Sequence, residues 1–159
     1  MNITQSSEED KINLMPDVIF LLNIVDATKL YGINNTVVNQ LIAYNDDFLS
    51  LGYSMIASGI EPAVFEHAMK NFIDGENDLF SKLKKSIQVE AMLAMQQGFN
   101  LTLTAMLIFS KFGMNFKKQY IEAIKKLDNS LYEKIFTDCE FSGLDIRLFI
   151  RCDERDFYS

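Results

Sequence analysis

Glycines divide this chain into segments of helical length. Six of the seven glycines stand where a helical pattern stops, and between them apolar residues recur every three or four positions. Glycine takes up the left-handed conformation that ends many helices without a steric cost. Only residues 146–150 are ambiguous between helix and strand. The pattern therefore predicts an all-α protein, a compact bundle of about seven to nine short to medium helices. The six glycines are Gly32, Gly59, Gly75, Gly98, Gly113 and Gly143.

The expected helices follow from apolar periodicity between these glycines. Residues 101–112 are apolar on nearly all sides, so we expect them to form the buried central helix. The expected helices are 16–30, 36–44, 46–58, 62–73, 77–97, 101–112, 116–127, 130–137 and 144–151. Side chains expected to face the core include Val18, Leu21, Leu22, Val25, Val37, Val38, Leu41, Ile42, Val64, Phe65, Ala68, Met69, Phe72, Ile73, Tyr120, Ile121, Ile124 and Leu127.

The length and composition fit a single helical domain. The chain has 159 residues and is 48% hydrophobic, which is enough for a substantial core. Residues 1–12 are polar and expected to be disordered. Residues 13–113 are expected to form the core, and residues 114–159 a C-terminal helical extension.

Net charge and cysteine usage limit the class of partner and the compartment. A net charge of −7 at pH 7 disfavours binding to nucleic acid or anionic lipid. No run reaches about 18 apolar residues, so no membrane span is expected. The acidic N-terminus is unlike a secretory signal, and two cysteines without a CxxC spacing are typical of a reduced, cytoplasmic protein.

The basic residues gather in one part of the sequence. This cluster has two interpretations: the solvated face of an amphipathic helix, or a patch that binds an acidic protein partner. It consists of Lys111, Lys117, Lys118, Lys125, Lys126 and Lys134.

No arrangement of residues predicts catalysis, a metal or a cofactor. His67 is the single histidine, whereas nitrogen and sulfur metal sites need three or four ligands. The acidic pairs, such as Asp46 with Asp47, fit helix starts better than acid–base catalysis. We therefore expect a protein that is not an enzyme. An enzyme using Cys139 or Cys152, with distant His67 as the base, is the weaker alternative.

Three methionines suggest a second kind of function. Met92, Met95 and Met106 lie in the apolar middle of the sequence, and methionine lines some promiscuous binding grooves. The alternative function is thus a regulatory or effector helical bundle, viral or bacterial, that binds a peptide or an apolar ligand in a groove. The same residues also fit an ordinary core.

Three segments, in order, resemble the cytoplasmic part of the flagellar stator protein MotA. Residues 27–33 place Lys29 three positions before Gly32, as the family does after its second membrane helix. Residues 46–73 resemble the pattern D-P-F-hydrophobic-x-x-G followed by D-G-x-[DE]-P. Residues 90–100 resemble E-x-x-L-A-x-Q-x-G-x-N. The matching residues in the last two segments are Asp46, Phe48, Leu49, Gly52, Gly59, Glu61, Pro62, Glu90, Leu93, Ala94, Gln96, Gly98 and Asn100.

The resemblance implies a stator-like core in residues 13–113 and a non-catalytic, protein-binding role. The family's four membrane helices are missing, so ion conduction and torque are not implied. Its acidic rotor-contact residue falls near Val37, and only Lys29 carries over. Residues 141–157 faintly resemble helices of the rotor switch protein FliG. The expected partner is a protein, such as a flagellar rotor or stator component, and a homo-oligomer is left open. Expected partner-binding residues are Lys29, Lys117, Lys118, Lys125 and Lys126.

Overall fold

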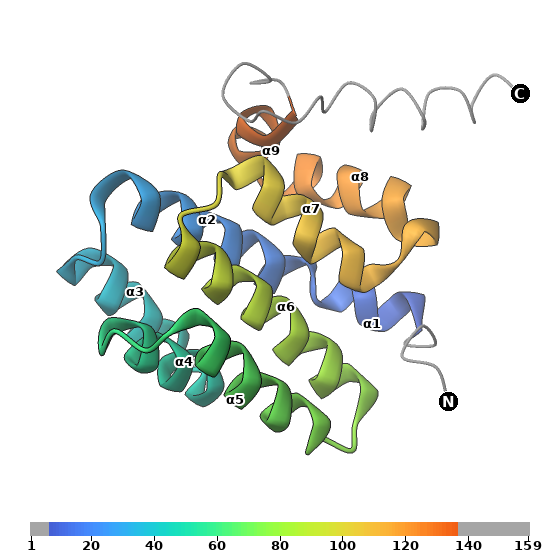
Figure 1. Ribbon diagram of the computed structural model, residues 1–159. Helices are drawn as coiled ribbons and strands as arrows, with labels where there is room; N and C mark the ends of the chain where they lie inside the picture. The colour runs from blue at the N-terminus through green and yellow to red at the C-terminus, as the bar shows by residue number, and fades with distance from the viewer. Residues whose placement is uncertain (1–6, 137–159) are drawn as a thin grey trace, which may run out of the picture.

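The chain forms an all-α bundle, which confirms the predicted fold class (Figure 1). The computed structural model describes residues 7–136. Within this range, no helix combines the length and apolar character needed to cross a bilayer. The elements are α1 (Glu8–Asn13), α2 (Met15–Tyr31), α3 (Asn35–Tyr44), α4 (Asp47–Ala57), α5 (Pro62–Asp74), α6 (Leu79–Gln97), α7 (Leu101–Phe112), a 3-10 turn (Met114–Phe116), α8 (Lys117–Leu127) and α9 (Asn129–Phe136).

Helix α6 lies at the centre of the bundle. It packs against α2, α4, α5 and α7, so helices cover it on several sides. In Figure 1, α3, α4 and α5 lie on one side of α6, while α7, α8 and α9 lie on the other. The expectation that residues 101–112 form the central helix is wrong. In α7, Leu101, Leu103, Met106 and Leu107 are only half-buried.

Side-chain caps set where most of these helices begin. Asn34, Asp46, Asp78 and Asn100 each accept a hydrogen bond from the backbone N–H three residues later. Each cap satisfies one of the N–H groups that a helix start leaves without a partner. At the other end of α6, Gly98 takes the left-handed conformation at φ 70°, which lets the chain turn into α7.

The core contains most, but not all, of the expected inward residues. The stripe Val18, Leu21, Leu22 and Val25 is buried as predicted. In contrast, four residues expected to face inward are 48–66% exposed, and that expectation is wrong for them. Helices α3 and α5 lie at the edge of the bundle, so a neighbour covers only part of their apolar surface. The four residues are Ile42, Val64, Phe72 and Leu127.

The N-terminal segment also differs from expectation. Residues 8–12, expected to be disordered, belong to α1, which Ser7 caps through a bond from the Asp10 N–H at 3.2 Å. Residues 1–6 lie outside the described residues. So do Cys139, Cys152, the expected helix 144–151 and the FliG-like segment 141–157.

Candidate functional site: a groove between α2 and α3

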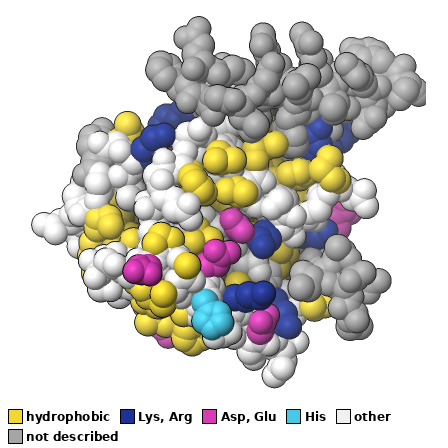
Figure 2. Space-filling model, viewed as in Figure 1, with side chains coloured by type: hydrophobic (Ala, Val, Ile, Leu, Met, Phe, Trp, Pro, Cys, Tyr) yellow, Lys and Arg dark blue, Asp and Glu magenta, His cyan; other side chains and the backbone are white. Residues whose placement is uncertain are grey.

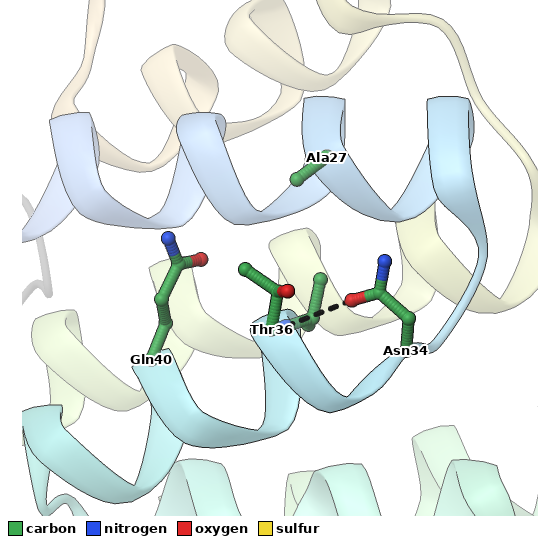
Figure 3. Close-up of a pocket in the computed structure, with 5 residues that line it drawn as sticks. Ala27, Asn34, Thr36 and Gln40 are labelled. Atoms are coloured by element: carbon green, nitrogen blue, oxygen red, sulfur yellow. Dashed lines mark hydrogen bonds between the residues drawn. The ribbon is translucent and has the colours of Figure 1, made fainter.

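Two adjoining hollows lie between α2 and α3. One has a volume of about 320 Å³ and is lined by Ala27, Asn34, Thr36, Val37 and Gln40 (Figure 3). The other has a volume of about 400 Å³ and also includes Gln40. Because they share this side chain, we treat them as one feature and call it the α2–α3 groove. The second hollow is further lined by Phe20, Asn23, Ile24, Ala43 and Tyr44.

The walls of the groove are held in place before anything binds. At one end, Phe20 and Tyr44 stack with ring centroids 4.1 Å apart and an angle of 7° between their planes. Asn23 Nδ2 donates to Asp128 Oδ2 at 3.2 Å, which ties the α2 wall to the end of α8. Asn34 is fixed as the cap of α3, accepting from the Val37 N–H at 3.0 Å. A ligand would therefore meet a preformed surface.

None of the described residues that line the groove is charged. The polar side chains are the amides of Asn23, Asn34 and Gln40 and the hydroxyl-bearing Thr36 and Tyr44. Figure 3 shows Thr36 and Gln40 pointing from α3 toward α2. Such a lining can donate and accept hydrogen bonds and bury apolar groups. Among the described lining residues there is no carboxylate, histidine, lysine or cysteine.

The lysines that the sequence singled out do not form one surface. Lys117 is only 6% exposed, so it is not available to a docked partner, contrary to its expected role. A lysine can bury its long aliphatic stem in this way. Lys118 is exposed in the first turn of α8, and Lys125 and Lys126 are exposed in its last turn, roughly 12 Å further along the axis.

Two lysines of the expected cluster pair with acidic residues of other helices. Lys111 pairs with Glu90 at 3.5 Å, and Lys134 pairs with Asp26 at 3.1 Å. Lys29 is exposed in the last turn of α2, one turn after Asp26. Lys118, Lys125 and Lys126 are the exposed members of the expected cluster on α8, and Lys29 lies on a different helix.

The described residues show no groove lined by Met92, as the alternative function would need, because Met92 belongs to the core. Met92 is completely buried, and Met95 and Met106 are half-buried. A Cβ atom added at Gly52 would lie against Met92 Sδ and only 2.8 Å from Met92 Cε. The missing side chain at Gly52 thus makes room for Met92 between α4 and α6.

Residues that carry the family resemblance connect the segments in which they occur. Gln96 Nε2, at the end of α6, donates to the Ile60 carbonyl at 2.7 Å, 36 positions earlier in the chain. Asp46 caps α4 through the Leu49 N–H at 2.9 Å, and Asn100 caps α7 through the Leu103 N–H at 2.8 Å. The matching residues therefore act as caps and packing contacts in this fold.

A half-buried polar cluster joins α2, α4 and α6. Burial works to raise the pKa of Asp46, but the Leu49 N–H, the nearby Gln88 amide and Lys84, 3.5 Å away, together outweigh it and lower that pKa. Burial raises the pKa of Asp17; Lys84 opposes this effect and Asp46 adds to it. Gln88 is 1% exposed, and its Nε2 makes no hydrogen bond within normal distance of any described residue. Burial thus makes ionisation of Asp17 less favourable in the folded chain than in the unfolded chain.

The described residues contain no group of three or more histidine, cysteine or carboxylate side chains that could hold a metal ion. The single histidine, His67, is exposed on α5 (Figure 2). Both cysteines proposed as nucleophiles in the enzyme alternative lie outside the range that the structure covers.

Comparison with protein-family models, with curated proteins and with solved structures finds no match to this chain. The site is thus defined by its geometry. Periodicity and motif spacing did not reveal the groove, but one signal was readable: residues 30–45, which include all of α3, contain no charged side chain.

Proposed function

We propose that this chain is a non-catalytic protein-interaction module that resembles the cytoplasmic domain of the stator protein MotA and binds a motor or envelope protein. The observation that supports this proposal is the packing of two of the segments that carry the resemblance. Residues 46–73 form α4 and α5, residues 90–100 end α6, and these three helices pack on one another.

Each of two contacts between the segments involves one matching residue. Gly52 faces Met92 across the α4–α6 contact, and Gln96 bonds to the backbone between α4 and α5. Their packing favours a shared structural unit over a set of independent coincidences.

A protein partner fits the surface chemistry better than a small-molecule substrate. The described residues that line the α2–α3 groove include no carboxylate, histidine, lysine or cysteine, the side chains that most often act as acid, base or nucleophile in a reaction. The exposed lysines of α8 provide positive charge on a chain whose net charge is −7. We propose that Lys118, Lys125 and Lys126 contact an acidic protein surface, and that Lys29 extends this contact.

Binding between purified proteins tests the proposal. The full chain is immobilised, and the cytoplasmic domains of a stator protein and of the rotor switch protein FliG are flowed over it. We expect one of them to bind. Replacing Lys125→Glu together with Lys126→Glu should weaken that binding about tenfold or more, because like charges then face each other.

The matched control changes the charge by the same amount elsewhere. Lys70→Glu with Lys82→Glu alters α5 and α6 and should change the dissociation constant by less than about twofold. Equal weakening by both pairs of substitutions would show that net charge alone governs binding. The assignment of the α8 lysines as the binding surface would then be wrong. Failure of both motor domains to bind would overturn the proposed function.

A further inference from the structure

Helix α3 has an unusual outer surface. Between Lys29 and Asp46 the chain runs through 30–45 without a single charged residue, although 23% of the whole chain is charged. At average usage a segment of this length would hold about four charges. An edge helix normally carries them on its solvent face. The exposed residues of α3 are instead Asn35, Thr36, Asn39, Gln40, Ile42 and Ala43.

Large apolar side chains extend this uncharged surface. Ile42 is 66% exposed on α3, and Leu30 and Ile33, which precede α3, are 64% and 46% exposed. With the α2–α3 groove, which also lacks charge, they form what we call the α3 face. Isolated exposed apolar residues are ordinary, whereas an apolar and amide surface without charge has the composition of an interface core.

We propose that the α3 face binds a second copy of this chain and forms a two-fold symmetric dimer. In such an interface the same patch occurs on both partners, so a residue near the symmetry axis meets its own copy. Any charge there would face an identical charge. Absence of charge near the axis avoids this repulsion and is compatible with self-binding.

Charge also favours a second copy of this chain over a different protein as the partner of the α3 face. The chain carries −7, so two copies repel each other, and this repulsion is least where the contacting faces themselves carry no charge. A different protein is usually recognised through complementary charges, and the α3 face presents none. Asn39 and Gln40 each carry both a donor and an acceptor, so they can bond to their own copies.

The size of the α3 face sets the expected affinity of the dimer. Helix α3 has 10 residues, a length of about 15 Å. A patch of this length buries less than the roughly 800 Å² per partner that is typical of stable complexes. We therefore expect a dimer with a micromolar or weaker dissociation constant, stronger at higher salt because salt screens the repulsion.

Sedimentation velocity of the full chain tests the dimer. Between about 5 and 500 µM the mass should rise from the 18.2 kDa of one chain toward twice that value. Ile42→Asp should raise the dissociation constant by about a hundredfold or more, and Asn39→Asp, which keeps the side-chain shape, by about tenfold. Both sites are exposed, and circular dichroism will show whether each variant keeps its helices.

Val64→Asp is the matched control, because Val64 is 52% exposed on α5, away from the α3 face. It should dimerise like the parent chain. Nitrogen–proton correlation spectra at low and high concentration should shift for residues 30–44 in particular. A monomer at every concentration would overturn the proposal. A dimer that tolerates both Ile42→Asp and Asn39→Asp would do the same, since its contact would lie elsewhere.

Discussion

The contact between Gly52 and Met92 predicts that Gly52→Ala changes the free energy of unfolding in opposite directions in the parent chain and in a Met92→Ala variant. Gly52 lies inside α4, where its backbone is helical and any residue is allowed. Alanine there would ordinarily stabilise the helix by about 1 kcal/mol. The added Cβ would, however, collide with Met92 Sδ and lie 2.8 Å from Met92 Cε, with Met69 Sδ at 3.6 Å.

The two effects can be weighed. Met92 and Met69 are both fully buried, so Met92 cannot swing into solvent. Overpacking a core costs about 1–3 kcal/mol. After subtraction of the helix-propensity gain, Gly52→Ala should lower the free energy of unfolding by about 0–2 kcal/mol. Met92→Ala alone should lower it by about 2–5 kcal/mol, because it leaves a cavity.

In the Met92→Ala background the collision is gone. Gly52→Ala should then raise the free energy of unfolding by about 1 kcal/mol. The effect of Gly52→Ala thus differs by about 1–3 kcal/mol between the two backgrounds, which is the coupling energy of the pair. Urea unfolding of the four chains, followed by circular dichroism, measures it.

Gly75→Ala serves as the control. Gly75 has φ −75°, and a Cβ there would meet only the Asn71 and Phe72 carbonyls, at ordinary distances of 3.5 and 3.6 Å. Its effect on the free energy of unfolding should be the same in the parent chain and in the Met92→Ala background. If Gly52→Ala stabilised the parent chain as much as the Met92→Ala variant, the steric argument would be refuted.

Three further predictions concern polar groups. Gln96→Leu removes the donor to the Ile60 carbonyl and should lower the free energy of unfolding by about 1–3 kcal/mol in urea. Tyr120→Phe should cost about 1 kcal/mol, because the buried hydroxyl donates to the Ala105 carbonyl at 2.8 Å; an unchanged urea midpoint would contradict this. Burial raises the pKa of Asp17, so the folded chain holds this proton more tightly than the unfolded chain does. The resulting contribution to the free energy of unfolding is lost as pH rises through the folded pKa. Asp17→Asn should therefore stabilise the chain at pH 7, with an advantage that fades as pH falls toward 3.8; an equal gain at all pH values would argue against it.

The sequence predicted the helices well because each helix signals itself locally. Apolar periodicity and caps such as Asn34 and Asp46 act within one or two turns, so a single segment contains the information. The exposure of Ile42 and Phe72 could not be read in this way. An apolar stripe indicates which side of a helix faces inward. How much of that stripe is buried depends on the number of neighbouring helices that pack against it.

The candidate site was predictable only in part, for a similar reason. Lys117 and Lys118 are adjacent in sequence, yet one is buried and the other exposed, because the turn before α8 sets which side meets the core. The role of Met92 depended on Gly52, a contact made only after folding. The uncharged run 30–45, by contrast, was available to simple inspection, although its place at a groove was not.

The attachment of α3 has a consequence for local unfolding. This helix packs chiefly on α2 and α4, and left-handed residues flank it, Gly32 at φ 71° and Asn45 at φ 56°. It buries only Val37 and Leu41 fully. Its amide hydrogens should therefore exchange with solvent through an opening that leaves the α6 core intact, at a lower free energy than global unfolding. The helix that carries no charged side chain is thus also one that can open while the rest of the bundle stays folded.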